Sequence, residues 1–440
     1  MTSIDSERIE AQGIDSQRID SQRVEAPVSD RPAAQPAGLR VRPLSEADLD
    51  DILDLDSSAF GQDPPRDFLD DLVVPYLELD RYVGVRDPLA HQELVASAAI
   101  LSKKMTFPGG ALHPVAGVTW VAVRPGWRRR GLLRSMITEQ LHGLHATGAE
   151  PVAILTASEA ALYGRYGYGQ AIGQARLELL HGASLRPGTA TEAVVETRPE
   201  RARPLARALY ERVAPTAPGH LSRTDAVWNL RTSDHAELRD GASRRRWALH
   251  PDGYVCYRVK AGWTQHGPNS QLVLDEICAA TPLARASLWQ YLMSMDLVRT
   301  VNYRAGWVDD PLRDLLLDPR RMQLTVSDHV WLRIVDLDRT IGLRSYSAPF
   351  RAVVELTDVL CPWNAGTWVL DLTGSGGSAA RSTDRPQLRL DIVDLGAAFL
   401  GGTPFARLAA AGRVTGDPAT VRALDAALAT ALAPWCPEGF

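Results

Sequence analysis

A strand, an arginine-rich turn and a helix follow one another between residues 116 and 146. Apolar residues run to Val123, the turn ends in three arginines and Gly131, and from Leu132 apolar residues recur at helical spacing. A helix that starts directly after a tight turn leaves its first backbone N–H groups unpaired and presents the positive end of its dipole. Such a terminus, flanked by arginines, binds phosphate groups. We therefore expect the turn to bind a ligand that carries a diphosphate.

The chain has 440 residues, too many for one hydrophobic core, so two to four domains are expected. Hydrophobic residues make up 45% and charged residues 23%, as in soluble globular proteins. The formal net charge of -5 argues against a nucleic-acid partner and is compatible with a cationic small substrate.

Four cysteines, Cys256, Cys278, Cys361 and Cys436, lie far apart and form no CxxC pair. This spacing argues against a disulfide framework and against a metal site, and it fits a reducing cytoplasm. No apolar run reaches the roughly 18 residues that cross a bilayer, and the first residues lack the apolar core of a signal peptide. We expect a cytoplasmic protein without a membrane segment.

Residues 1–38 contain no aromatic side chain, end in a Pro/Ala stretch and repeat an apolar residue every five positions. A spacing of five falls on one face of neither a helix nor a strand. We expect a disordered leader, with a docking peptide that folds on a partner as the alternative.

Residues 39–187 read as one α/β unit. Two helices come first, then an antiparallel meander, the strand–turn–helix described above, another strand and a short helix. The expected helices lie near 49–55, 68–77, 132–146 and 159–166, and the strands near 81–85, 94–101, 116–123 and 152–156.

Residues 188–328 repeat this pattern, with helices near 199–213 and 283–297 and strands near 247–250, 253–259 and 271–278. The turn before the second helix reads Ala279-Ala280-Thr281-Pro282 and has no arginine, so we expect a duplicated domain that has lost its ligand turn.

Residues 329–440 form a third unit, in which the Gly/Ser-rich stretch 374–382 is expected to be a flexible hairpin loop. The predicted fold class is α/β (α+β): two tandem mixed-sheet domains and a smaller α+β domain.

The pattern Arg128-x-x-Gly131-x-Leu133 after a strand resembles motif A of the GNAT superfamily of N-acetyltransferases, Q/R-x-x-G-x-G/A, with Leu133 departing at the last position. The run from Arg128 to Leu133 is similar to the form used by the Eis family, and Tyr163 to Gly169 match that family's YGRxGYG. The family joins a catalytic GNAT domain, a degenerate GNAT domain and a sterol-carrier-protein-like domain. The three units match in order and size over about residues 40–440.

This resemblance implies acetyl-CoA as cosubstrate. The backbones of Val121 and Val123 would bond the pantetheine arm, and Arg128, Arg129, Gly131 and Leu132 would hold the diphosphate. Trp120 stands where the family has an aromatic that lines the acceptor pocket, and a core tryptophan is an equal alternative.

The resemblance also implies the acid and the base. Tyr163 carries over as the general acid, because a hydroxyl with a pKa near 10 can donate to a leaving thiolate. The base in the Eis family is the carboxylate of the chain's own C-terminus, here Phe440. A free terminal carboxylate has a pKa near 3.5, so it either needs desolvation or orients the amine. Gly439 stands where an acidic residue would help to bind a polyamine.

Residues 46–71 hold ten acidic side chains against one basic residue, Arg66, a field that would attract polycations. Asp56, Asp63 and Asp67 are our candidates for facing the acceptor, with a solvated helix face as the alternative. The resemblance implies acetylation of aminoglycosides at several amines and a homohexamer. Lysine side chains of peptides are the alternative acceptor, and a non-enzymatic lipid carrier built on the third unit is the second alternative.

Overall fold

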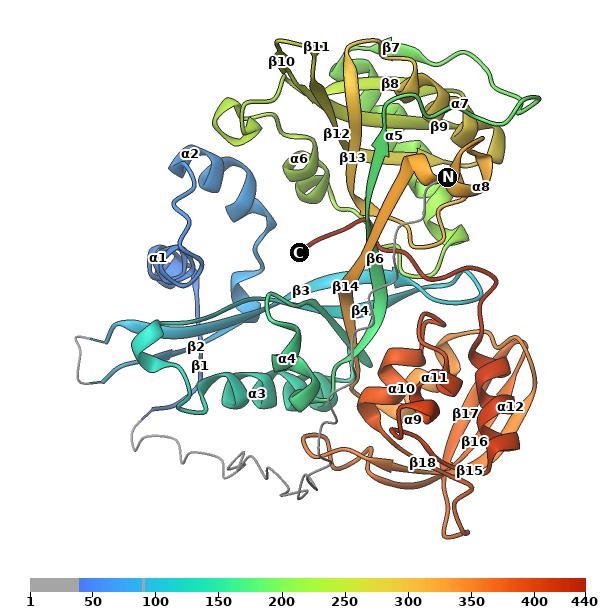
Figure 1. Ribbon diagram of the computed structural model, residues 1–440. Coiled ribbons are helices and arrows are strands. Elements are labelled where there is room, and N and C mark those ends of the chain that lie inside the picture. The colour runs from blue at the N-terminus through green and yellow to red at the C-terminus, as the bar shows by residue number, and fades with distance from the viewer. Residues whose placement is uncertain (1–38, 89–91) are drawn as a thin grey trace, which may run out of the picture.

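The computed structural model describes residues 39–88 and 92–440, so the expected leader lies outside the described residues. Figure 1 shows two α/β units, one coloured blue to teal and one green to yellow, above and beside a third unit in orange and red. The fold class expected from the sequence is confirmed.

One mixed sheet of twelve strands runs through both α/β units, in the order β1-β2-β3-β4-β5-β14-β6-β13-β12-β9-β8-β7. The first unit supplies β1 (Arg42–Pro43), β2 (Tyr82–Arg86), β3 (Leu94–Thr106), β4 (Leu112–Val123), β5 (Val152–Thr156) and β6 (Gly169–Leu180). The second supplies β7 (Val195–Thr197), β8 (Arg246–His250), β9 (Gly253–Lys260), β12 (Ser270–Ala279), β13 (Val298–Gly306) and β14 (Met322–Ile334). A separate hairpin joins β10 (Trp263–Thr264) to β11 (Gly267–Pro268).

Strand β14 belongs to the second unit in sequence but lies inside the sheet of the first. It pairs antiparallel with β6 from Met322↔Leu179 to Leu332↔Gly169, and its end pairs with β5. The predicted unit boundary at 187/188 falls between β6 and β7, whereas the boundary at 328/329 falls inside β14. The two units are therefore joined by backbone hydrogen bonds as well as by the chain, and the domain limits stay a prediction.

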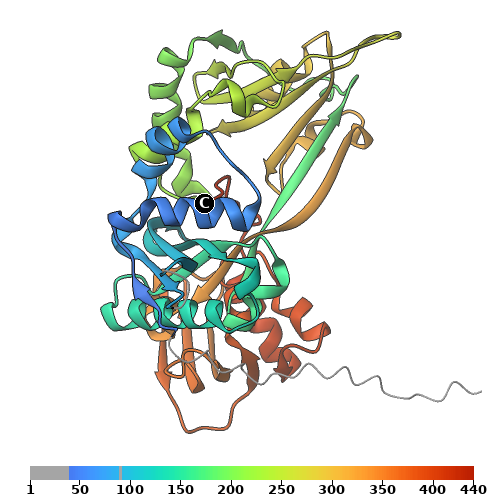
Figure 2. The same cartoon turned by 90° about the vertical axis from the view of Figure 1, so that its left-hand side faces the viewer.

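Helices α1 (Leu49–Phe60) and α3 (Leu132–Thr147) cover opposite faces of the first unit's strands, as Figure 2 shows. Leu55 of α1 packs with Ala99 of β3, while Met136 of α3 packs with the neighbouring Ala98. Adjacent strand residues point to opposite faces, so this alternation places the two helices on either side of the sheet.

The helix expected at 68–77 is irregular in the structure. A single α-turn, α2 (Arg66–Phe68), is followed by a π-turn at Leu69–Val73 and a 3-10 turn at Val74–Tyr76. Pro75 has no backbone N–H to give to the helix ladder, which explains why a regular α-helix does not extend through this stretch.

The second unit places α5 (Pro199–Val213), α6 (Asp225–Thr232) and α7 (Pro282–Met293) against its strands, with a short α8 (Leu312–Leu315). The residues of α5 match the predicted range, and α7 ends four residues earlier than expected.

The third unit has a five-stranded sheet, β17-β16-β15-β18-β19, and helices α9 to α12. Its strands are β15 (Phe350–Thr357), β16 (Gly366–Thr373), β17 (Gly376–Arg381), β18 (Leu388–Asp391) and β19 (Thr415–Gly416); its helices are α9 (Leu337–Thr340), α10 (Ile392–Ala398), α11 (Phe405–Ala410) and α12 (Pro418–Leu428).

The expectation of a flexible loop at 374–382 is wrong, because β17 pairs with β16 from Thr373↔Gly376 to Trp368↔Arg381. Gly376 adopts φ +150°, a conformation that glycine allows because it has no Cβ, and the strand hydrogen bonds use only backbone groups. Within residues 39–88 and 92–440, no helix is long and apolar enough to cross a membrane.

Candidate active site

Strands β4 and β5 run side by side over only two residue pairs, Ala116↔Ala153 and Gly117↔Ile154. Strand β3 follows β4 further, to Val123. Near the end of β4 a bulge sets Trp120 and Val121 against one residue of β3, and Trp120 takes the left-handed φ of +50°. The β5-facing edge of residues 118–123 is thus free of strand pairing within the described chain, and a free edge can pair with an extended ligand.

The turn that follows β4 is exposed and its backbone is concave. Arg129 has φ +63° and Gly131 has φ +80°, conformations that turn successive N–H groups toward one side. Across the part of the chain that the structure describes, the N–H groups of residues 129–134 donate to no backbone carbonyl. The first N–H of α3 that does so belongs to Ser135, at 3.0 Å from the carbonyl oxygen of Gly131. The turn therefore retains free donors for an anion.

The three arginine side chains of the turn differ in their contacts. Arg128 Nε donates to the carbonyl of Val123 at 3.3 Å. The Arg130 guanidinium lies 4.5 Å from the centre of the Trp127 ring, a cation–π contact. Arg129 is exposed. Each guanidinium keeps further N–H donors that an anion can use.

The corresponding helix of the second unit has a closed start. Thr281 Oγ1 accepts from the N–H of Ala284 at 3.1 Å, and Pro282 has no N–H to offer. Arg285, in the first turn of α7, forms a buried ion pair of 2.9 Å with Asp310. That the second unit has lost its ligand turn stays a prediction.

Tyr163 is the last residue of α4 (Ala160–Tyr163), a short helix that begins after three residues of loop beyond the end of β5. Its side chain packs in the core between α3 and the sheet. Burial, with smaller contributions from Tyr166 and Glu159, raises the pKa of Tyr163 to about 12. The hydroxyl makes no hydrogen bond with the described residues. It is not fully enclosed by protein, so a ligand can reach it. It is therefore a protonated donor that is free to bond a ligand.

The last residue of the chain reaches the point where β4 and β5 separate. One carboxylate oxygen of Phe440 accepts a hydrogen bond of 2.9 Å from Thr156 Oγ1, at the end of β5. The Phe440 ring lies over Gly117, where a Cβ atom would be 3.3 Å from a ring carbon. Figures 1 and 2 both show the C-terminus between the two α/β units.

A buried carboxylate two residues earlier fixes this tail. Glu438 is 2.5 Å from Arg223 and 3.3 Å from Arg231, both in the second unit. Arg223 also pairs with the buried Glu276 at 2.9 Å. Burial alone would lower the pKa of Arg223, but the attraction of the Glu276 and Glu438 carboxylates outweighs it and the pKa is raised. His329 of β14 bonds the carbonyl of Glu438 at 2.7 Å. The second unit thus holds the C-terminus in the first.

Matches to known families follow the same three units. Family models described as an acetyltransferase (GNAT) domain match residues 40–171 and 219–334, and a sterol carrier protein domain matches residues 337–437. An uncharacterized N-acetyltransferase of Streptomyces avermitilis is 37% identical over 372 residues, 82% of this chain and 90% of that protein. N-acetyltransferase Eis of Mycobacterium tuberculosis is 34% identical over 368 residues, 80% of this chain and 87% of that protein.

The chain belongs to the Eis family of N-acetyltransferases. Among solved structures, Eis1 from Mycobacterium abscessus superposes with a TM-score of 0.79 and 30% identity, covering 91% of this chain and all of that one. A GCN5-related N-acetyltransferase from Kribbella flavida gives a TM-score of 0.73 and 26% identity over 91% of this chain and 98% of that one. The protein is an Eis-family acetyltransferase enzyme, which excludes a solely lipid-carrying protein.

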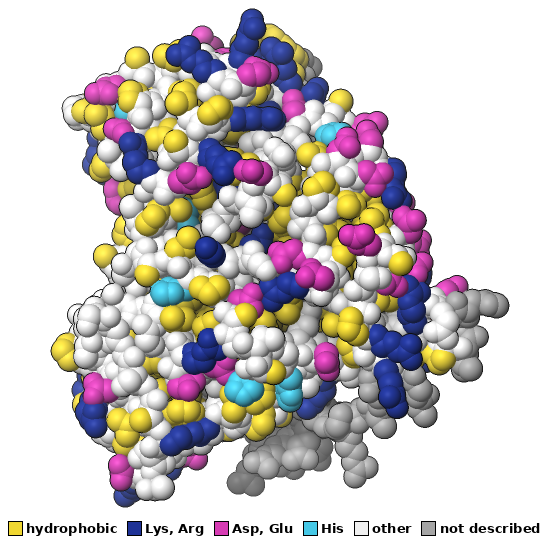
Figure 3. Space-filling view, turned by 180° about the vertical axis from the view of Figure 1, so that it is seen from behind, with side chains coloured by type: hydrophobic (Ala, Val, Ile, Leu, Met, Phe, Trp, Pro, Cys, Tyr) yellow, Lys and Arg dark blue, Asp and Glu magenta, His cyan; other side chains and the backbone are white. Residues whose placement is uncertain are grey.

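The other predicted site residues lie on the α1 side of the sheet. Trp120 packs beside the core around Leu55. Asp56 is partly buried, and this burial raises its pKa to about 6. Asp63 is exposed in the loop between α1 and α2, and Asp67 is exposed within α2. Figure 3 shows acidic side chains gathered along the edge of the Eis-family enzyme that carries α1 and α2.

Several acids of this edge already have basic partners: Asp50 and Asp70 pair with Arg66, Asp48 and Asp51 with Arg86, and Asp54 with Arg124. Within the described residues Asp56, Asp63 and Asp67 have no such ion pair, and of these three only Asp56 is partly buried.

Sequence reasoning did not single out Arg223, Glu438 or Lys103. Arg223 pairs with Glu438, two residues before Phe440, and Lys103 Nζ lies near the Phe440 ring. A charged residue inside the otherwise apolar, proline-braced end of the chain was the available signal. Its partners lie more than 200 positions away and could not be paired from spacing.

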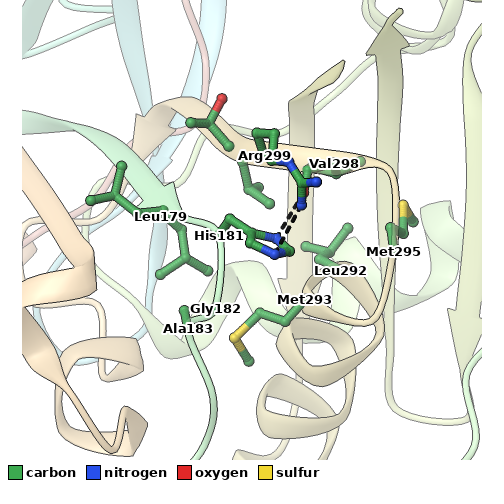
Figure 4. A pocket seen from close by; sticks show the side chains of 12 residues that line it. Leu179, His181, Gly182, Ala183, Leu292, Met293, Met295, Val298 and Arg299 are labelled. Carbon is green, nitrogen blue, oxygen red and sulfur yellow. Dashed lines mark hydrogen bonds between the residues drawn. The ribbon is translucent and has the colours of Figure 1, made fainter. Parts of the chain in front are cut away.

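A small cavity in the second unit lies between the start of β13, the end of α7 and the end of β6 (Figure 4). His181 and Arg299 hydrogen-bond across it at 2.9 Å. Its volume of about 20 Å³ is room for a single water molecule, so it does not serve as an acceptor pocket.

Proposed function

We propose that the acetyl donor is acetyl-CoA, held where β4 leaves β5. The free N–H groups of residues 129–134, beside the unpaired edge of β4, are the observation that carries this proposal. Arg128, Arg129, Gly131 and Leu132 would hold the diphosphate, and the backbones of Val121 and Val123 would bond the pantetheine amides. Bound acetyl-CoA supplies the acetyl group as an activated thioester.

Tyr163 would act at the sulfur. Because its pKa is about 12, it keeps its proton throughout the neutral range and donates a hydrogen bond, then the proton, to the departing sulfur. Its packing against Ala116 and Val118 of β4 and Leu155 of β5 supports this role.

The carboxylate of Phe440 would act at the amine. Thr156 holds one oxygen of the terminal residue at 2.9 Å, and the Glu438 contacts restrict the tail. So held, the carboxylate orients the incoming ammonium group and accepts its proton, directly or through water.

The proposed acceptor is an amine of a polycationic small molecule such as an aminoglycoside, modified at several positions. Support comes from the acidic edge on α1 and α2, from the partly buried Asp56, and from membership of the Eis family. We further propose a cytoplasmic homohexamer, by resemblance to that family, which light scattering of the purified protein would test.

The test compares kanamycin and tobramycin with a lysine peptide, each with acetyl-CoA and the purified full-length protein. We expect faster acetyl transfer to the aminoglycosides and products that carry more than one acetyl group by mass spectrometry. A clear excess of peptide turnover would instead assign the protein as a lysine acetyltransferase.

A further inference from the structure

Lysine is rare in this chain. Of its 48 basic residues only three are lysines: Lys103, Lys104 and Lys260. Lys104 and Lys260 are exposed, whereas Lys103 is only 9% exposed. An amine of this kind is costly to bury without a partner, so its surroundings need an explanation.

Lys103 crosses from β3 over β4 at the point where β4 and β5 separate. Its Cγ would be 3.1 Å from a Cβ at Gly117, the same position over which the Phe440 ring lies at 3.3 Å. Its Nζ is 5.7 Å from the centre of the Phe440 ring. Gly117 is the last residue of β4 that pairs with β5, so the amine lies at the mouth of the gap.

This amine lies on the acceptor side of the sheet. The neighbouring residues of β4, Ala116 and Val118, pack on the other face with Ile137 of α3. Residue 117 points away from α3, and so do the two side chains above it. Lys103 and Phe440 therefore approach the gap from the face opposite the helix whose first turn is free to bind phosphate.

The amine is held by a hydroxyl and not by a charge. Lys103 Nζ donates to the hydroxyl of Tyr76 at 2.7 Å. Within the described residues, no carboxylate oxygen lies within 4.0 Å of Lys103 Nζ, the distance that defines an ion pair. Burial lowers the pKa of Lys103 to about 8, although Glu438, Glu78 and Cys436 oppose the shift. An appreciable fraction of neutral amine, the form that attacks a thioester, is present near neutral pH.

We propose that Lys103 is a built-in acceptor, which the enzyme acetylates when no external amine is bound. This inference rests on acetyl-CoA as the donor. The neutral Nζ attacks the thioester carbonyl carbon, a C–N bond forms and the C–S bond breaks. The sulfur leaves as CoA thiol with a proton from Tyr163, and the proton lost by the nitrogen passes to the Phe440 carboxylate. The product amide is uncharged, so the acceptor face becomes more acidic.

The experiment incubates the full-length protein with acetyl-CoA and no acceptor, then maps acetylated peptides by mass spectrometry over time. We expect one acetyl group on Lys103, formed faster than any on Lys104, its exposed neighbour on the same strand. Tyr163→Phe should slow the modification of Lys103 by about 10²–10⁴-fold. Lys104→Arg, the matched control, should leave it unchanged.

Two results would overturn the inference. Equal labelling of Lys103 and Lys104, unaffected by Tyr163→Phe, would show non-enzymatic acetylation. An unmodified Lys103 in a preparation that acetylates an external amine would reject self-acetylation while leaving the proposed function intact. If the preparation acetylates neither, both proposals fail.

Discussion

At the scale of single residues, burial sets the protonation of three groups of the proposed site, Tyr163, Asp56 and Lys103. Burial disfavours the charged form of each group, so it raises the pKa of Tyr163 to about 12 and that of Asp56 to about 6, and it lowers that of Lys103 to about 8. The site thus combines a firmly protonated donor, a destabilised anion and a partly neutral amine. Each can be tested by one substitution.

Replacing the acid should slow the chemistry and spare binding. We expect Tyr163→Phe to lower kcat by about 10²–10⁴-fold with little change in the Kd for acetyl-CoA, because only the proton donor is lost. Tyr166→Phe, in the same motif, is the control and should change kcat little. Steady-state kinetics with one amine acceptor provide the measurement, and a small effect at Tyr163 would reassign the acid.

Asp56→Asn should stabilise the fold while it weakens binding of a cationic acceptor. The folded pKa of about 6 lies above the ordinary value of 3.8 for this carboxyl. The folded state therefore binds the extra proton between these values, and stability falls as pH rises through this window. Above about pH 6 the cost of the buried charge is constant. We expect the variant to be about 1–2 kcal/mol more stable at pH 7, allowing for solvent screening, and equal to the parent near pH 4.

Urea unfolding at several pH values, together with KM for an aminoglycoside, checks both parts of the Asp56 prediction. A stability difference that does not depend on pH would remove the buried charge as its cause. An unchanged KM would take Asp56 out of the acceptor site.

At the scale of elements, the features that could be predicted from the sequence are those that depend on residues close together in the chain. The limits of β5 and α5 agree with the pattern of apolar residues, and the free turn before α3 agrees with its arginines and Gly131. Pairing over long distances left no local signal. The insertion of β14 between β5 and β6, and the ion pair between Arg223 and Glu438, depend on residues more than 140 positions apart.

The turn before α3 offers a matched pair of glycines. Gly131 has φ +80°, which costs an alanine roughly 1–2 kcal/mol, so we expect Gly131→Ala to weaken acetyl-CoA binding about tenfold. Gly143 lies in the exposed middle of α3 with nothing within 4 Å of a Cβ. Gly143→Ala should bind acetyl-CoA as the parent does and be about 0.5–1 kcal/mol more stable. Equal binding by both variants would contradict the role of the turn.

The C-terminal segment can be tested without altering any buried side chain. Residues added after Phe440 convert its carboxylate into an amide and crowd Thr156. We expect such a protein to lose turnover while its Kd for acetyl-CoA stays the same, measured by calorimetry. Normal turnover in the extended protein would reject the terminal carboxylate as a participant.

At the scale of the whole molecule, one sheet carries two units with different roles. The first has the free turn and the separated strands, and the second has a capped helix start and supplies Arg223 and Arg231 to the tail. Strand β14 joins them by pairing with both β5 and β6. We therefore propose that the second unit positions the C-terminal tail and holds no second cofactor site, and we expect each chain to bind one acetyl-CoA.

Titrating the protein calorimetrically with acetyl-CoA, and then with S-acetylpantetheine, which lacks the nucleotide and its diphosphate, tests the central claim. We expect one site per chain for acetyl-CoA and affinity for S-acetylpantetheine that is lower by roughly 100-fold or more, because the charge-assisted bonds to the turn are lost. Equal affinity for the two thioesters, or no binding of acetyl-CoA, would show that the free N–H groups before α3 do not hold the donor.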